Sequence, residues 1–64
     1  MHDIREVYKK VLIKRLLQDE ITHSEAYTLA AFLYEDYQKE EDEDVRNQIY
    51  SLLAKLACVI PIAQ

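Results

Sequence analysis

The chain contains no glycine, and its only proline is Pro61. Glycine supplies the left-handed backbone on which hairpin turns, phosphate-binding loops and strand bulges depend, so these elements are disfavoured along the whole chain. Half of the residues are apolar, which is enough to favour a folded chain over a disordered one. The sequence therefore predicts an all-α fold in which helices are joined by short polar turns.

Three helices are expected, at about residues 3–20, 23–40 and 43–60, within a single domain that spans residues 1–64. Thr22 stands three positions before Glu25, which is the spacing of a capping box at the start of a helix. These features predict a small three-helix bundle.

The two other helix boundaries have different signals. The five consecutive acids at positions 40–44 are suited to the amide end of a new helix, where they would complement its dipole. If this break did not form, the second and third helices would fuse into a long hairpin that needs a second copy. Pro61 disfavours helical geometry at Ile60 and should end the third helix there.

A chain of 64 residues can build only a thin core, so reinforcement is expected. The single cysteine, Cys58, excludes an internal disulfide, and no cluster of metal ligands or cofactor-binding motif is visible. We expect Cys58 to be buried or half-buried and the protein to be cytoplasmic, because a lone thiol fits a reducing setting. Docking on a partner or on a second copy, as a homodimer, is the expected reinforcement.

The apolar positions of the last two helices each form a stripe. The stripe of the third helix follows a heptad pattern and is formed by Val45, Ile49, Leu52, Leu56 and Val59. The second helix has one apolar face, formed by Ala26, Leu29, Ala30, Leu33, Tyr34 and Tyr37. Phe32 falls outside the stripe of its helix and lies among charged positions. We therefore expect Phe32 to be exposed and to contact a partner.

The apolar face of the first helix changes direction along the helix. In the first half it is formed by Ile4, Val7, Tyr8 and Val11, and in the second half it moves to nearly the opposite side. One straight helix cannot bury both faces on one core, so something else should cover one of them, unless the helix curves or the N-terminal tail folds over it. We expect a dimer interface at the second face, formed by Ile13, Leu17 and Ile21.

Charge is segregated along the chain, with +3 over residues 1–18, −9 over residues 19–44 and +2 over residues 45–64, for a net charge of −4. Acids at helix starts and on solvated faces would explain this pattern without a partner. The functional interpretation is an acidic and aromatic surface that attracts a protein with a basic surface. Its predicted residues are Phe32, Tyr34, Glu35, Asp36, Glu40, Glu41, Asp42, Glu43 and Asp44.

Two other classes of function remain as alternatives. A DNA-binding regulator could use the basic residues of the first helix, Lys9, Lys10, Lys14 and Arg15, although the acidic start of the third helix would repel phosphates. A purely structural helical oligomer would bind only itself. No arrangement of residues typical of catalysis is present, and no apolar run is long enough to span a membrane. The sequence therefore predicts a non-enzymatic adaptor or inhibitor of a protein partner.

Overall fold

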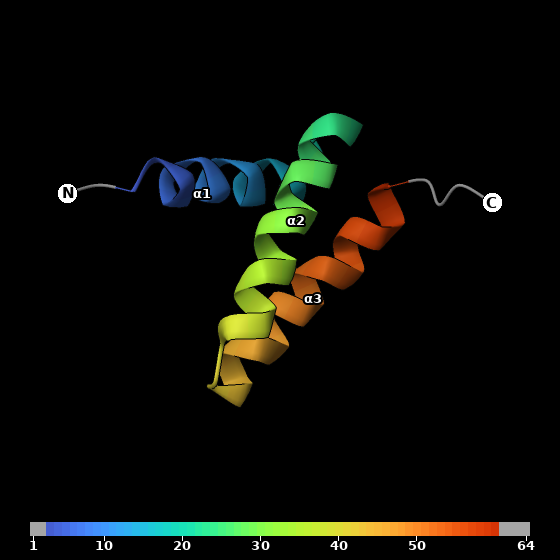
Figure 1. Ribbon diagram of the computed structural model, residues 1–64. Helices are drawn as coiled ribbons and strands as arrows, with labels where there is room; N and C mark the ends of the chain where they lie inside the picture. The colour runs from blue at the N-terminus through green and yellow to red at the C-terminus, as the bar shows by residue number, and fades with distance from the viewer. Residues whose placement is uncertain (1–2, 61–64) are drawn as a thin grey trace.

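The computed structural model describes residues 3–60 and contains three helices, α1 (Ile4–Leu17), α2 (His23–Lys39) and α3 (Glu43–Val59) (Figure 1). Within residues 3–60 there is no strand, so the prediction of an all-α three-helix bundle is confirmed. Each helix begins and ends within three residues of its predicted bounds. None of the described helices is both long and apolar enough to cross a membrane.

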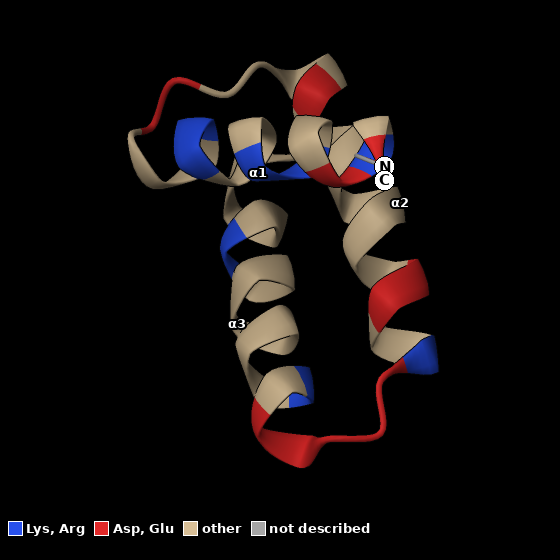
Figure 2. Ribbon diagram, turned by 90° about the vertical axis from the view of Figure 1, so that its left-hand side faces the viewer, with Lys and Arg blue, Asp and Glu red and all other residues tan. Residues whose placement is uncertain are grey.

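The helices are arranged as a hairpin with a third helix lying across it. α2 and α3 run side by side in opposite directions, joined at one end by a short acidic turn (Figure 2). α1 crosses α2 instead of lying along the hairpin, and its N-terminal half extends to one side (Figure 1). This crossing decides which side of α2 is covered and which side is open.

The core lies where the three helices meet. α2 contributes three buried residues, α1 and α3 two each, and the set is Leu12, Leu16, Ala26, Leu29, Leu33, Ile49 and Leu56. The remaining positions of the α3 stripe, Val45, Leu52 and Val59, and the adjacent Leu53 are partly buried against this cluster. The stripe of the third helix therefore forms one side of the bundle core. Of the predicted α2 face, Tyr34 stays exposed.

The predicted start of α2 is confirmed in its details. The backbone N–H of Glu25 donates to the Thr22 hydroxyl at 3.1 Å, and the Thr22 N–H donates back to the Glu25 carboxylate at 3.1 Å. This reciprocal pair is a capping box, which satisfies two amides that the first helical turn leaves without partners. Ile21, just before the cap, is partly buried against the core.

The break between α2 and α3 is also present, so the fused hairpin is excluded. Asp42 is the N-cap of α3, and its carboxylate accepts from the backbone N–H groups of Asp44 and Val45. α3 ends at Val59, and Ile60 has extended geometry with φ −81° and ψ 118°, as expected before a proline. Local side-chain chemistry thus fixes both boundaries.

α1 ends with a left-handed residue that is not glycine. Asp19 has φ 59°, in the left-handed region that glycine usually occupies after a helix. Its N–H donates to the Leu16 carbonyl at 3.2 Å, and the Glu20 N–H donates to the Arg15 carbonyl at 2.8 Å. These two bonds form a Schellman motif, in which aspartate takes the left-handed position because it tolerates that geometry better than most residues.

Candidate partner-binding surfaces

Phe32 is not the exposed contact residue that the sequence pattern indicated. Its side chain is half-buried and packs against the core. α1 covers it: the Arg5 guanidinium carbon lies 4.8 Å from the ring centroid, and the Tyr8 ring meets it edge-on at 6.2 Å. The expected exposure was wrong because Arg5 and Tyr8, in the first half of α1, cover this side of α2, and the contact of Phe32 with a partner stays a prediction. Phe32 therefore holds two helices of the same chain together.

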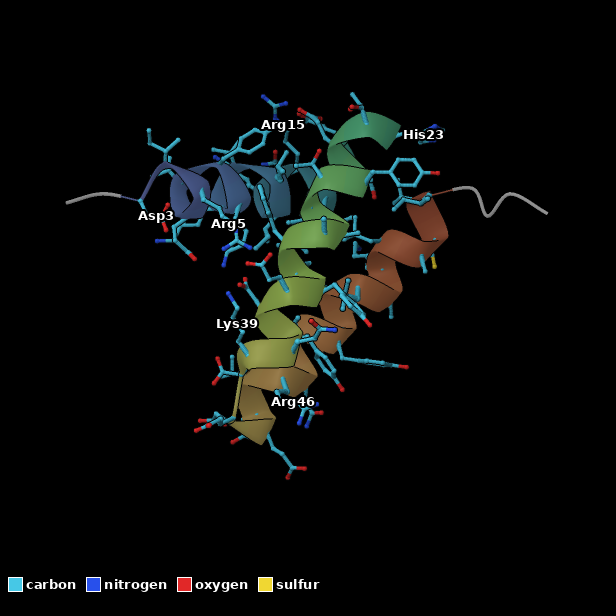
Figure 3. All side chains as sticks on the ribbon, in the orientation of Figure 1. Asp3, Arg5, Arg15, His23, Lys39 and Arg46 are labelled. Carbon is cyan, nitrogen blue, oxygen red and sulfur yellow. The ribbon has the colours of Figure 1, made fainter. Side chains whose placement is uncertain are left out.

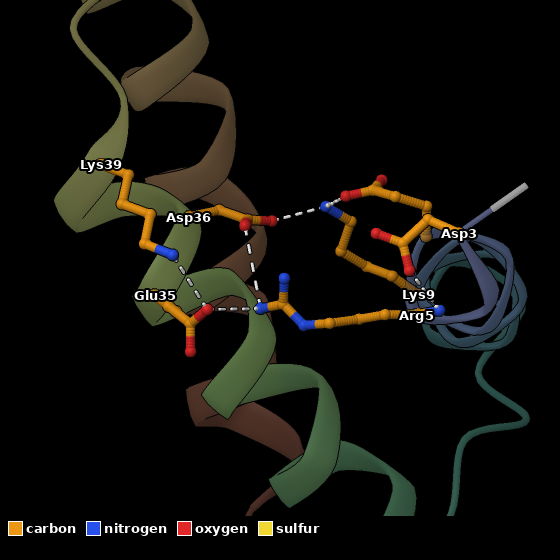
Figure 4. A network of polar contacts seen from close by, with 7 residues as sticks. Asp3, Arg5, Lys9, Glu35, Asp36 and Lys39 are labelled. Carbon is orange, nitrogen blue, oxygen red and sulfur yellow. Dashed lines mark hydrogen bonds and ion pairs between the residues drawn. The ribbon is translucent and has the colours of Figure 1, made fainter. Parts of the chain in front are cut away.

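Glu35 and Asp36, two of the predicted partner-binding acids, are also used within the chain. Arg5 lies 3.2 Å from Glu35 and 3.9 Å from Asp36, and Asp36 accepts a hydrogen bond from Lys9 (Figure 4). Arg5 points from α1 toward α2 (Figure 3). Partly exposed ion pairs contribute only about 0–1 kcal/mol each, so this network orients α1 more than it stabilises the fold.

Lys9 is the most enclosed charge of this network, with a side chain that is 13% exposed. Desolvation alone would lower its pKa, but the hydrogen bonds to Asp36 and Glu6 and the charges of these two acids more than offset that effect. The pKa of Lys9 is therefore raised above its ordinary value. The ammonium group stays charged at neutral pH and is committed to partners in the same chain.

Some carboxylates of the acidic segment 40–44 form hydrogen bonds within the chain, and others do not. Asp42 caps α3, and the Glu40 carboxylate accepts a hydrogen bond from the Asp42 N–H at 3.2 Å. Glu41, Glu43 and Asp44 are exposed, and their side chains form no hydrogen bond or ion pair with other residues of the described chain. These three carboxylates, at the end of the hairpin, are what remains of the predicted acidic surface (Figure 2).

The predicted dimer interface on α1 is only partly available. Ile13 and Ile21 pack against the core of their own chain, whereas Leu17 is 58% exposed. Ile13 and Ile21 are partly buried because the crossing of α1 turns the second half of the helix toward the hairpin, and their part in a dimer interface stays a prediction. The uncovered face is the first one, and the role of Leu17 in a dimer stays a prediction.

The basic residues of α1 do not form one free patch. Lys9 pairs with Glu6 and Asp36, and Arg15 pairs with Glu25. Of the four residues proposed to contact DNA, Lys10 and Lys14 are exposed and make no ion pair with residues 3–60. Two lysines are a small footprint for phosphate binding, which usually needs several cations on one face.

A group of tyrosines lies on the side of the hairpin away from α1. The Arg46 guanidinium stacks on the Tyr37 ring, 4.5 Å from its centroid, and so links α2 to α3. Tyr34 lies one turn before Tyr37 on α2, and Tyr50 lies one turn after Arg46 on α3. We refer to Tyr34, Tyr37, Arg46 and Tyr50 as the tyrosine face.

Two of the three tyrosines of the tyrosine face are largely exposed to solvent. Tyr34 is 58% exposed and Tyr50 is 62% exposed, and Tyr27, two turns before Tyr34, is 55% exposed. Tyr34 was among the predicted site residues, but Tyr50 was missed. Tyr50 falls outside the α3 stripe just as Phe32 falls outside the α2 stripe, so the same reasoning applied to α3 would have found it.

In residues 3–60, no set of three or more histidine, cysteine, aspartate or glutamate side chains could hold a metal ion. Cys58 is exposed, so the expectation that it is buried or half-buried was wrong. Its thiol donates weakly to the Ala54 carbonyl, one turn earlier in α3, at 3.7 Å.

No family model matches this chain, and neither a curated protein nor a solved structure matches it significantly.

Proposed function

We propose that this protein is a non-enzymatic binding module, an adaptor or inhibitor in the cytoplasm, that holds an arginine-bearing segment of a protein partner on its tyrosine face. The exposure of Tyr34 and Tyr50, each one helical turn from the Tyr37–Arg46 contact on the side away from the acidic turn, is the observation that carries the proposal. Tyrosine and arginine are enriched among the residues that dominate protein–protein binding, because they combine large contact area with a polar end.

The chemistry of the partner follows from the charge around the tyrosine face. The chain has a net charge of −4, and Glu43 lies two turns before Tyr50, on the same side of α3. Arg46 already shows how a guanidinium stacks on a tyrosine ring here. An incoming arginine would stack on Tyr34 or Tyr50 in the same way, with Glu41 and Glu43 attracting it to the site.

The first experiment titrates the protein with a short oligoarginine peptide and, separately, with an oligolysine peptide of the same length, followed by NMR chemical shifts. We expect oligoarginine to bind more tightly and to shift residues of the second half of α2 and the first half of α3. The double variant Tyr34→Ala/Tyr50→Ala should lose about fivefold or more in affinity, since each cation–π contact contributes about 0.5–1 kcal/mol at an exposed site.

Tyr27→Ala is the matched control, because it removes an equally exposed tyrosine far from the acidic turn. It should leave the affinity unchanged. Equal binding of the two peptides, with no loss in the double variant, would show that the acids attract cations without the tyrosines and would refute the proposal. A natural partner is then recognised in cell lysate as a protein retained by wild type and Tyr27→Ala but lost with the double variant.

We also propose that the module is a homodimer. The support is the apolar face of α1 formed by Ile4, Val7, Tyr8 and Val11, whose side chains are between 41% and 83% exposed.

A further inference from the structure

The first two turns of α1, residues 4–11, are attached to the rest of the molecule without core packing. None of their side chains is buried, and the buried residues of this helix, Leu12 and Leu16, both follow them. Arg5 and Lys9 connect this part of α1 to α2 through ion pairs (Figure 4). We call residues 4–11 the N-terminal segment of α1. It can leave α2 while the second half of the helix stays in the core.

The surface of α2 beneath Arg5 has the composition of an arginine-binding site. The Phe32 ring lies 4.8 Å from the Arg5 guanidinium carbon. The carboxylates of Glu35 and Asp36, one turn further along α2, lie 3.2 Å and 3.9 Å from Nη2 of Arg5. An aromatic ring beside carboxylates favours arginine over lysine, because a planar guanidinium stacks on the ring and pairs with the acids at the same time. We call Phe32, Glu35 and Asp36 the α2 arginine site.

Arg5 occupies the α2 arginine site with poor geometry. Its Nη2 atom is buried, yet it makes no hydrogen bond with any atom of residues 3–60. The same atom lies 3.2 Å from the Glu35 carboxylate, so the two groups are close but are not aligned for a hydrogen bond. A guanidinium that is not attached to α1 can turn to donate two parallel hydrogen bonds to a carboxylate. An arginine of another chain can therefore pair with this site better than Arg5 does.

We propose that the α2 arginine site binds an arginine of a partner protein, and that the N-terminal segment of α1 is autoinhibitory because Arg5 occupies this site in the free protein. Binding then requires release of residues 4–11, and the apparent affinity is reduced by the fraction of molecules in which this segment is closed. The site lies on the α1 side of the hairpin and shares no residue with the tyrosine face. The proposal therefore goes beyond the proposed function and does not depend on it.

The test removes the two cations that hold the segment and measures the affinity for the oligoarginine peptide. Every protein in this experiment carries Tyr34→Ala/Tyr50→Ala, so the tyrosine face does not contribute and a negative result leaves the proposed function intact. Adding Arg5→Ala/Lys9→Ala should raise the affinity about fivefold or more, because the site is no longer occupied.

Lys10→Ala/Lys14→Ala is the matched control for charge. It removes two positive charges from exposed positions of the same helix, so both variants change the net charge equally. At physiological salt it should raise the affinity less than about twofold, because charges in solvent are screened. Equal gains in the two variants would show that net charge alone controls binding, and would overturn the arginine site.

Phe32 reports on the site directly, because it is the only phenylalanine of the chain. In the Arg5→Ala/Lys9→Ala protein, oligoarginine should shift the NMR resonances of this ring more than oligolysine does, and adding Phe32→Leu should remove the gain in affinity. Peptide that binds without shifting the ring resonances, or a gain that survives Phe32→Leu, would overturn the proposal.

A second measurement keeps Arg5 and Lys9 in place and decides the question if their replacement prevents folding. Saturating oligoarginine should move the backbone shifts of residues 4–11 toward random-coil values, whereas residues 12–17 should keep helical shifts. Saturated protein in which residues 4–11 stay helical and in contact with Phe32 would show that α1 is not displaced, and would overturn the autoinhibition.

Discussion

Asp19 holds the left-handed position after α1, with φ 59°, and its carboxylate lies at the carbonyl end of the helix. Replacement by glycine should relieve steric strain, which is about 1–2 kcal/mol for an ordinary residue in this geometry and smaller for aspartate. It also removes a charge that the helix dipole disfavours by about 0.3–1 kcal/mol. The greater freedom of glycine in the unfolded chain opposes these gains by about 0.5–1 kcal/mol.

The net expectation for Asp19→Gly is a free energy of unfolding higher by about 0.5–1 kcal/mol, which raises the Tm of so small a domain by several degrees. Asp19→Asn separates the contributions, because it removes the charge and keeps the tolerance of left-handed geometry; it should gain about 0.3–0.5 kcal/mol. Asp19→Ala should be less stable than the asparagine variant by about 0.5 kcal/mol or more.

Urea denaturation followed by circular dichroism measures all of these variants, at one low protein concentration so that self-association adds nothing. If Asp19→Ala proved as stable as Asp19→Gly, backbone geometry at this position would not limit stability. The explanation of how a chain without glycine ends α1 would then be wrong.

Two further changes test the contacts around α2. The hydrogen bond from the Thr22 backbone N–H, together with the charge of Arg15, lowers the pKa of Glu25 below its ordinary value of 4.5. The ionised Glu25 carboxylate therefore stabilises the fold above pH 4.5, and this stabilisation is lost as the pH falls through the lower pKa of the folded state. Glu25→Gln should therefore flatten the decline in unfolding free energy between pH 7 and about pH 3, and a decline as steep as that of wild type would contradict this. Phe32→Ala should cost about 2 kcal/mol in urea denaturation, because the ring is half-buried against α1, whereas Tyr27→Ala should stay within about 0.5 kcal/mol. A loss at Phe32 no larger than at Tyr27 would mean that α1 does not cover the ring.

The secondary structure could be predicted because its boundaries are local. Thr22 and Glu25 are three positions apart and can only meet at a helix start, and Asp42 caps α3 by the same chemistry. The apolar stripe of α3 needed no knowledge of its neighbours. The Schellman end of α1 was not predicted, because aspartate in the left-handed position has no distinctive sequence pattern in a chain without glycine.

The candidate site was harder to predict, because periodicity tells which residues share a side of a helix and not what covers that side. Phe32 and Tyr50 each fall outside the stripe of their own helix, yet α1 covers Phe32 and leaves Tyr50 exposed. Likewise Glu35 and Asp36 are paired with Arg5, thirty positions away along the chain. The crossing of α1 over α2 depends on packing among all three helices.

Because α1 only crosses the hairpin, α1 should open locally more easily than α2 and α3. α2 and α3 pack together most extensively, whereas α1 is held by Leu12, Leu16 and ion pairs to Glu35 and Asp36. Amide protons of α1 should therefore exchange with solvent before those of the hairpin, and faster as added salt screens the ion pairs. When α1 detaches, Phe32 becomes an exposed aromatic ring beside the carboxylates of Glu35 and Asp36. Local opening of α1 alone therefore exposes an acidic and aromatic surface that is covered in the native state.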